Sequence, residues 1–479
     1  MLAALLKSAS LRAAAVLGLG GLAFTLGNLI LARTLPAPEY GLVSLVIGIV
    51  SVAGLAAPLG LDLVIGRRGL PLEGRLRQAI LGIAMLVGVV AAVVSAVLYR
   101  VDVALAASIG VATIASGLMQ ASAAHFQGRQ RFGAATWIVQ FSNWTVLLAA
   151  VLTSALGLTT AAAACIVLAL TTAAGGVLAW WLATTAVAAE THKASNGSEA
   201  VSGPNGGAAP EAVGGLAASV APEADAGSPG FTGPNPGAAP AGSDQLPLAG
   251  PTPLSGALMQ EALALVSIHV ANSVFLQLER LLLAPVAGVQ ALALFGVVAA
   301  LVASPFRMLQ MAVLFTLIPS LRRAGDVQAR RRLLGREALL VAAVSGAGGI
   351  VIWYVAPPLA HWFLAGRYDL GPALMCAALV SGFFKLCSAF ATGTVIALSE
   401  DKGLRQLSVV SWTTIGMSVG AAFAAAPWGL VGVLYGISSG WLVRSLIAAW
   451  MARPHLRRPD ARLREAPFGD RSQMPRARR

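Results

Sequence analysis

Residues 201–230 read VSGPNGGAAPEAVGGLAASVAPEADAGSPG and lie within a longer run, residues 190–256, that divides the chain in two. This run is rich in Ala, Gly, Pro and Ser, contains one aromatic residue, Phe231, and has no apolar periodicity. Such a composition cannot bury enough apolar surface to offset the entropy lost on ordering. We therefore expect a disordered linker at 190–256, with a hydrophobic block on each side.

The two flanking blocks have the composition of a membrane protein. The chain is 57% hydrophobic and 11% charged, with a mean hydropathy of +0.77, whereas soluble domains carry about 25% charged residues. Several stretches of about 20 apolar residues are long enough to cross a hydrocarbon core of ~30 Å as helices. The ~10-residue alternation of membrane β-barrel strands is absent. We expect an all-α polytopic membrane protein.

Twelve transmembrane helices are predicted, six in each hydrophobic block. The predicted domains are an N-terminal six-helix lobe at 1–189, the linker at 190–256, a C-terminal six-helix lobe at 257–452 and a basic tail at 453–479. Two parallel six-helix repeats are a common transporter architecture, with a central cavity near the bilayer midplane between them. The predicted spans are 13–33, 41–65, 79–99, 103–123, 135–155, 160–186, 257–278, 290–318, 337–358, 371–397, 407–426 and 429–451.

The distribution of basic residues predicts the orientation of these helices. Most of the 33 Lys and Arg residues fall in the N-terminus, the even-numbered connections, the linker and the tail, which share one side of the membrane. Cytoplasmic loops carry such an excess, so we expect a multi-pass protein of the bacterial cytoplasmic (inner) membrane with both termini in the cytoplasm. The net charge of +13 is explained in this way, and no nucleic-acid partner is expected. The clustered loop arginines attract anionic membrane lipids.

The sequence contains little that points to an enzyme. A P-loop and an H-E-x-x-H motif are both absent. The three cysteines, Cys165, Cys376 and Cys387, lie within apolar spans without the spacing of metal ligands. A polymerase, ligase or glycosyltransferase would need catalytic carboxylates or a large outer loop, and the predicted outer connections are short. We expect no enzymatic activity, no cofactor and no metal site.

Charged side chains inside the predicted spans mark faces that do not contact lipid. An ionisable group there costs roughly 2.5–3.5 kcal/mol on insertion scales, so it usually faces a hydrated cavity or a partner. Arg307 lies within the eighth span, and Lys385 lies within the tenth. We assign Glu279 and Arg280 to a short outer connection, so no acidic residue is expected near the two cations. An anionic substrate is then their natural partner.

Other polar residues are candidates for the lining of the same cavity. They are Ser381, Ser388 and Thr392 on the face of Lys385; His269, Ser273, Gln277 and, at its outer end, Arg280 along one face of the seventh segment, with Asn272 adjacent; and Thr136, Gln140 and Asn143 in the fifth span. His269 is the mid-span imidazole that coupling to protons would use. The alternative for all of them is hydrogen bonding that only holds the helices together. For Arg444, nearer the inner face, we expect extension to the lipid headgroups.

Short motifs of this chain resemble those of a known transporter family in their order and spacing. They are LARTLPAPEYGL (31–42), LGL (59–61), QGRQRF (127–132), ERLLL (279–283), IPSLR (318–322) and FLAGRYDLGPA (363–373). The family is the polysaccharide transporter family, the O-antigen and exopolysaccharide flippases of the multidrug/oligosaccharidyl-lipid/polysaccharide exporter superfamily. The chain resembles it over nearly its whole length, except for the linker and the tail.

The resemblance implies a function and a binding site. Such proteins move undecaprenyl-pyrophosphate-linked oligosaccharides from the inner to the outer leaflet by alternating access, for lipopolysaccharide O-antigen, capsule or exopolysaccharide synthesis. Basic cavity residues hold the pyrophosphate, and by position this role falls on Arg307 and Lys385, with Arg33 at the outer rim. The implied partners are the lipid-linked oligosaccharide and the polymerase and chain-length proteins of the pathway.

Two other functions are compatible with the same pattern of spans. A multidrug or cation exporter of the superfamily would favour acidic residues in the cavity, and Arg307 and Lys385 argue against it. A non-transporting membrane component of a polysaccharide assembly complex would not need polar faces in both lobes.

Deletion of residues 195–250 is expected to leave both folding and transport intact, because a flexible linker only tethers the two lobes. The measurement is the amount of folded protein in the membrane, together with the outward movement of the lipid-linked glycan, in comparison with wild type. Loss of both would show that the segment is more than a tether.

Overall fold

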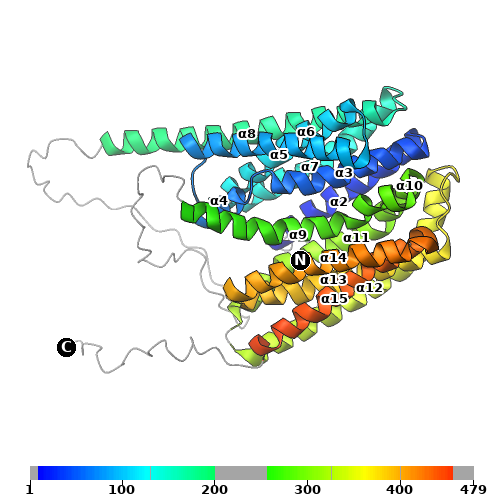
Figure 1. The fold of residues 1–479 in the computed structure, drawn as a ribbon. Helices are drawn as coiled ribbons and strands as arrows, with labels where there is room; N and C mark the ends of the chain where they lie inside the picture. The colour runs from blue at the N-terminus through cyan, green and yellow to red at the C-terminus, as the bar shows by residue number, and fades with distance from the viewer. Residues whose placement is uncertain (1–8, 130, 200–255, 325, 400, 457–479) are drawn as a thin grey trace, which may run out of the picture. The chain divides into compact units, whose positions relative to one another are not determined.

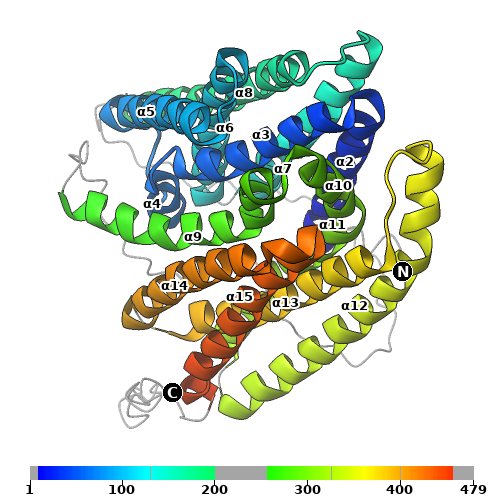
Figure 2. The ribbon, with the colours of Figure 1, turned by 45° about the vertical axis from the view of Figure 1, so that its right-hand side comes forward.

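The chain forms a helical membrane protein in a computed structural model, which describes residues 9–129, 131–199, 256–324, 326–399 and 401–456. Every regular element of these residues is helical (Figure 1, Figure 2). Ten helical stretches among them are long and apolar enough to span a membrane. Helices suit a bilayer because each backbone N–H and C=O finds its partner within its own segment. The predicted all-α polytopic class is confirmed.

The N-terminal lobe is built from α2 to α8. Within it α2 packs against α7, α5 packs against α6, and both α3 and α4 pack against α6. Helix α3 also packs against α9 and α10, and α2 and α4 make further contacts with the C-terminal lobe. The elements are α2 (Ala9–Thr34), α3 (Ala37–Ala56), α4 (Leu61–Arg68), α5 (Gly74–Tyr99), α6 (Val103–Gly128), α7 (Phe132–Ala155) and α8 (Ala161–Glu199).

The C-terminal lobe is built from α9 to α15. Helices α13 and α14 both pack against α15, and α11 packs against α13. The elements are α9 (Gly256–Ala287), α10 (Val289–Val298), the π-helical turn η1 (Ala299–Ala303), α11 (Ser304–Arg323), α12 (Val327–Phe363), α13 (Pro372–Leu398), α14 (Asp401–Ala425), the 3-10 turn η2 (Ala426–Trp428), α15 (Gly429–Ala452) and the 3-10 turn η3 (Pro454–Leu456).

The predicted second span, 41–65, is interrupted. Helix α3 ends at Ala56, and Leu59 and Gly60 have φ angles of 49° and 79° before α4 begins. Pro58 has no N–H to continue the helical hydrogen bonds, and Gly60 adopts the left-handed backbone without a steric penalty. These residues cause the break in the helix. A hydropathy profile does not show the break, because none of them is charged.

The predicted seventh span, 257–278, is too short. Helix α9 continues to Ala287, and Glu279 and Arg280 lie inside it with exposed fractions of 1% and 4%. The assignment of these two residues to an outer connection is therefore wrong. Adjacent charged residues mimic a helix end in a hydropathy profile, because charge is costly in lipid unless neighbouring side chains compensate it.

The linker prediction is only partly covered by the structure. Helix α8 continues past the predicted lobe boundary at 189 and ends at Glu199. Residues 200–255 of the linker lie outside the described residues, as does the tail from 457 onward. The expected disorder of the linker and the role of the basic tail stay predictions.

The two lobes meet along α3, α9 and α10. A methyl group added to Gly41 of α3 would overlap the carbonyl oxygen of Val289, so the backbones approach as closely as a small residue permits. Nearer the middle of the helices, the Thr25 hydroxyl of α2 donates a hydrogen bond to Ser304 Oγ of α11 at 2.9 Å. These contacts hold α11 against the N-terminal lobe, where it forms one wall of a cavity.

Replacing Gly41 by Ala is expected to destabilise the protein by about 1–3 kcal/mol, because overpacking a close contact pushes the two backbones apart. Thermal unfolding of the purified protein in detergent measures the effect. Gly348→Ala in α12 is the matched control, since nothing lies within 4 Å of the added methyl group there. Equal stability of the two variants would mean that the Gly41 contact does not hold the lobes together.

Candidate functional site

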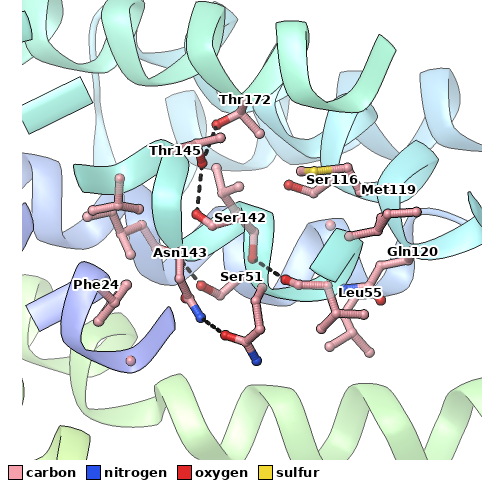
Figure 3. A pocket seen from close by; sticks show the side chains of 18 of the residues that line it. Phe24, Ser51, Leu55, Ser116, Met119, Gln120, Ser142, Asn143, Thr145 and Thr172 are labelled. Atoms are coloured by element: carbon pink, nitrogen blue, oxygen red, sulfur yellow. Dashed lines mark hydrogen bonds between the residues drawn. The ribbon is translucent and has the colours of Figure 1, made fainter. Parts of the chain in front are cut away.

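A cavity of about 250 Å³ lies between the two lobes. Its wall comes from α2, α3, α6, α7 and α8 of the N-terminal lobe and from α11 of the C-terminal lobe. Figure 3 shows hydroxyl and amide side chains of this wall, among them Ser51, Gln120 and Thr172. Of the described residues that line it, Arg307 alone is charged. The cavity therefore offers neutral hydrogen-bonding groups on one side and a cation on the other.

Of the polar face predicted on α7, Gln140 and Asn143 lie in this wall, whereas Thr136 lines neither cavity. Gln140 and Asn143 are about one turn apart, and Asn143 Nδ2 donates to Gln140 Oε1 at 2.6 Å. Further along the helix, Thr145 accepts a hydrogen bond from the Thr172 hydroxyl of α8 at 3.4 Å. One bond between the two amides leaves each of them with unused donor and acceptor sites. A ligand hydroxyl in the cavity can bind there.

Arg307 comes just after an irregular turn in its helix. The π-helical turn η1 ends at Ala303, and Pro305 follows at the start of α11. Proline disrupts the regular hydrogen bonds of the preceding turn, and a π turn changes the direction in which the following side chains point. The Arg307 side chain is exposed to the cavity, and within the described residues it has no hydrogen-bonding or ionic partner.

A smaller cavity, of about 60 Å³, adjoins the first, since Phe24, Ser304 and Arg307 line both. The rest of its wall comes from α9, α10, η1, α11 and α13. Its described wall contains three cations and one carboxylate, so it is positively charged overall. The polar residues that line it are Gln277, Glu279, Arg280, Ser304, Arg307, Gln310 and Lys385. Of the predicted site residues, Gln277, Arg307 and Lys385 are brought together here.

Lys385 has an unexpected partner. Its ammonium nitrogen lies 2.5 Å from Glu279 Oε1, and the Ser381 hydroxyl donates to the same oxygen at 3.3 Å. The Lys385 and Glu279 side chains are 12% and 2% exposed, and each compensates the other out of water. The prediction that no acidic residue lies near Lys385 is wrong, because α9 extends far enough to place Glu279 beside it. Lys385 is neutralised in this structure.

Most side chains of the predicted polar face of α13 are buried within the C-terminal lobe and do not line a cavity. Ser388 is 1% exposed and lines neither cavity, and the Thr392 hydroxyl donates to the Ser388 carbonyl oxygen at 2.7 Å. Ser381 contacts the carboxylate of Glu279 rather than open space. Of this face, only Lys385 lines a cavity.

Three other predicted site residues line neither cavity. His269 is exposed on α9. Arg33 is exposed near the end of α2, with its guanidinium 5.5 Å from the ring centre of Phe363. Asn272 accepts a hydrogen bond from Arg444. A role of these residues in binding or in proton coupling stays a prediction.

Arg444 is buried rather than extended to the headgroups. It is 2% exposed, and its guanidinium carbon lies 5.6 Å from the ring centre of Phe275 and 5.5 Å from that of Trp441. The two rings stack on each other at 3.9 Å. Aromatic faces attract a cation, and together with the amide oxygen of Asn272 they replace water around Arg444. The expectation that it extends to the headgroups is wrong.

The described helices form two lobes with a cavity between them. No protein-family model matches the chain, and no curated protein matches it. Solved structures do match. One is the inward-facing conformation of a multidrug resistance MATE family transporter of the MOP superfamily, with a TM-score of 0.57 and 14% identity over 91% of this chain and 94% of that one.

Two further structures extend the comparison. The outward-facing conformation of a multidrug resistance MATE family transporter gives a TM-score of 0.53 at 15% identity, over 94% of this chain and 97% of that one. A MOP superfamily transporter from Pyrococcus furiosus, described by the reverse polarity of its binding pocket, gives a TM-score of 0.55 at 14% identity. The match covers 94% of this chain and 97% of that one. At these identities the similarity establishes the fold alone. The chain has the same fold as these solved structures of MOP superfamily transporters.

Replacing Lys385 by Ala is expected to destabilise the protein by about 3–5 kcal/mol, because the buried Glu279 carboxylate is left without its partner. The double variant Glu279→Gln, Lys385→Ala is expected to recover at least half of that loss. Thermal unfolding of the purified protein in detergent provides the measurement.

The control for this pair is Arg336→Ala on α12. Arg336 forms an ion pair with Glu337 at 3.7 Å, but its side chain is 85% exposed. Exposed pairs contribute little, so a change of less than about 1 kcal/mol is expected. A double variant no more stable than Lys385→Ala alone would exclude the uncompensated carboxylate as the cause of the loss.

Proposed function

We propose that this protein is a flippase that moves an undecaprenyl-pyrophosphate-linked oligosaccharide from the inner to the outer leaflet of the bacterial cytoplasmic membrane. The product would serve O-antigen, capsule or exopolysaccharide synthesis. The observation that carries the proposal is the position of Arg307. It is exposed in the larger cavity between the lobes and has no ion-pair partner there, and the other described residues that line this cavity are uncharged. The fold likeness to transporters supports transport, and the charge of the cavity supports this substrate.

An anion is the partner that this cavity lacks. A guanidinium surrounded by protein in an apolar medium is costly unless an opposite charge or hydrogen-bond acceptors meet it. Arg307 has neither within the described residues. A phosphoryl group fits the planar fork of an arginine with two parallel hydrogen bonds. The pyrophosphate of a lipid-linked glycan provides such a group, next to the first sugar.

The N-terminal wall of the larger cavity suits the sugar. Gln140 and Asn143 present amide groups there, and Ser51, Ser116 and Gln120 add hydroxyl and amide groups. Neutral donors and acceptors of this kind match sugar hydroxyl groups. The proposal therefore divides the headgroup between the lobes, with the anion on α11 and the first sugar against α3, α6 and α7.

Translocation requires the lobes to move. The cavity of about 250 Å³ is at or below the ~300–1,000 Å³ of pockets for drug-sized ligands, so an oligosaccharide enters only when the lobes separate. With both termini in the cytoplasm, as proposed, the contact between Gly41 and Val289 belongs to the outer end. The conformation is then closed toward the outside, and the glycan loads from the inner leaflet.

The energy source of the proposed movement need not be a coupled ion. An inside-negative membrane potential favours the outward movement of a pyrophosphate by about 2.3 kcal/mol per charge per 100 mV. The cationic residues stay with the protein and cross a smaller part of the field. This makes the potential itself a sufficient driving force in principle.

A multidrug or cation exporter is the second candidate, because two of the similar structures are multidrug transporters. A cationic substrate would be repelled by Arg307. The carboxylate that could bind it, Glu279, already holds Lys385. The same charges therefore favour an anionic substrate. A non-transporting assembly component is the third candidate, and it gives no reason for an open cavity between the lobes.

The test of the proposed function is the leaflet accessibility of the lipid-linked glycan in cells. With Arg307→Gln we expect the rate of outward exposure to fall by tenfold or more, since a hydrogen bond to a charged group contributes about 1.5–3 kcal/mol. Arg336→Gln, a surface charge outside both cavities, is the matched control and is expected to behave as wild type at equal protein level.

Two outcomes would count against the proposal in different ways. Normal exposure with Arg307→Gln, but not in a deletion strain, would keep the flippase and remove Arg307 from the site. Normal exposure in the deletion strain, together with lost drug resistance, would favour the exporter.

A further inference from the structure

Arg280 crosses from the C-terminal lobe into the N-terminal lobe. It belongs to α9 and is 4% exposed. Its aliphatic stem lies against Gly48 of α3, where an added methyl group would come within 3.0 Å of Arg280 Cβ. Its guanidinium carbon lies 5.5 Å from the ring centre of Phe24 on α2. Gly48 provides the space for the stem, and the Phe24 ring provides a face for the charge.

Within the described residues Arg280 forms no direct ion pair with a carboxylate. The neighbouring carboxylate, Glu279, is held by Lys385 at 2.5 Å and by Ser381 at 3.3 Å. Arg280 shares the smaller cavity with Arg307, which has no ionic partner there either. A cation–π contact compensates a guanidinium only in part. Two guanidinium groups without an ion-pair partner among the described residues therefore line one small cavity.

We propose that Arg280 and Arg307 together form a binding site for a diphosphate group, one arginine for each phosphoryl unit. This inference rests on the proposed function and names the residues that hold its anion. The smaller cavity, at about 60 Å³, has room for a phosphoryl group but not for a sugar ring. The sugar extends into the larger cavity, which Arg307 also lines.

Lys385 acts in this site by positioning rather than by contact with the anion. It holds Glu279 through a direct ion pair, and so keeps that carboxylate from Arg280 and Arg307. Removing Lys385 leaves the Glu279 carboxylate uncompensated in the wall of the smaller cavity, where it repels the diphosphate. The loss of binding with Lys385→Ala should therefore be reversed by a second change, Glu279→Gln, which a direct contact from Lys385 would not allow.

The site also couples the anion to the contact between the lobes. Arg280 is in place only while Phe24 and Gly48 of the N-terminal lobe enclose it. A bound ligand stabilises the conformation for which it has the higher affinity. The diphosphate therefore favours the arrangement in which the lobes meet at α3 and α9. When the lobes part there, Arg280 is exposed to water and the anion is released more easily.

The experiment uses the purified full-length protein in detergent, with inorganic pyrophosphate as the probe and calorimetry as the measurement. Arg280→Gln and Arg307→Gln are each expected to weaken binding by at least tenfold. Arg336→Gln is the matched control, because the Arg336 side chain is 85% exposed and lines neither cavity. It is expected to bind within twofold of wild type. Wild-type affinity in Arg280→Gln, or no binding of pyrophosphate to the wild type, would overturn the site.

A purely structural role of Arg280 is separated by two further variants. Arg280→Lys keeps the charge without the planar fork, so partial binding is expected. Phe24→Leu removes the aromatic face and leaves both arginines, so binding within about threefold of wild type is expected. A loss with Phe24→Leu as large as that with Arg280→Gln would mean that Arg280 acts through lobe packing alone.

The source of the diphosphate is distinguished with two other probes. Undecaprenyl pyrophosphate in mixed micelles is expected to bind more tightly than uridine diphosphate. Tighter binding of the nucleotide would overturn the assignment to a lipid-linked anion. Arginine-dependent binding of pyrophosphate, in a protein that moves no glycan in cells, would uphold the site and reject the proposed function. The two proposals can therefore fail separately.

Discussion

The structure depends on how it compensates positive charge away from water. Among the basic side chains in the helices of the C-terminal lobe, Lys385, Arg444, Arg280 and Arg307 each have a different environment. Lys385 has a carboxylate partner in Glu279. Arg444 has two aromatic faces and the amide oxygen of Asn272. Arg280 has one aromatic face, and Arg307 has an open cavity. The cost of a buried charge falls only when a partner is supplied. Lys385 and Arg444 have such partners within the protein, and in the site that we propose the ligand supplies the partner of Arg280 and Arg307.

Irregular helix geometry positions these charges. The π turn before Pro305 directs the first turn of α11, and with it Arg307, toward the space between the lobes. The break at Leu59 and Gly60 ends α3 early and allows the short helix α4 to pack against α6 and α9. Both interruptions lie next to prolines, which cannot continue regular α-helical hydrogen bonding. In a membrane such interruptions persist where neighbouring protein satisfies the freed backbone groups. They therefore occur on faces that meet other helices or a cavity rather than lipid.

The two lobes contribute unlike chemistry to the space between them. The N-terminal lobe lines the larger cavity with neutral amides, hydroxyls and apolar groups, while the C-terminal lobe adds the charges. Close backbone contacts such as that of Gly41 with Val289 hold the lobes together, and buried apolar side chains of both lobes form one continuous core. Similar folds have been solved in inward-facing and outward-facing conformations.

The sequence by itself determined the class of the protein. Runs of about 20 apolar residues predict membrane helices from length alone, and the midspan positions of Arg307 and Lys385 identified two of the residues that share a cavity. Gln140 and Asn143 were predicted from their common helical face and do line a cavity. Only the tertiary structure decided which cations are compensated. The partner of Lys385 comes from another helix, 106 residues earlier in the chain, and that distance in sequence leaves no local signal. Burial of Glu279 and Arg280 likewise depends on neighbours from other helices. A hydropathy profile does not include such neighbours, since it scores each charged residue as if it faced only lipid or water.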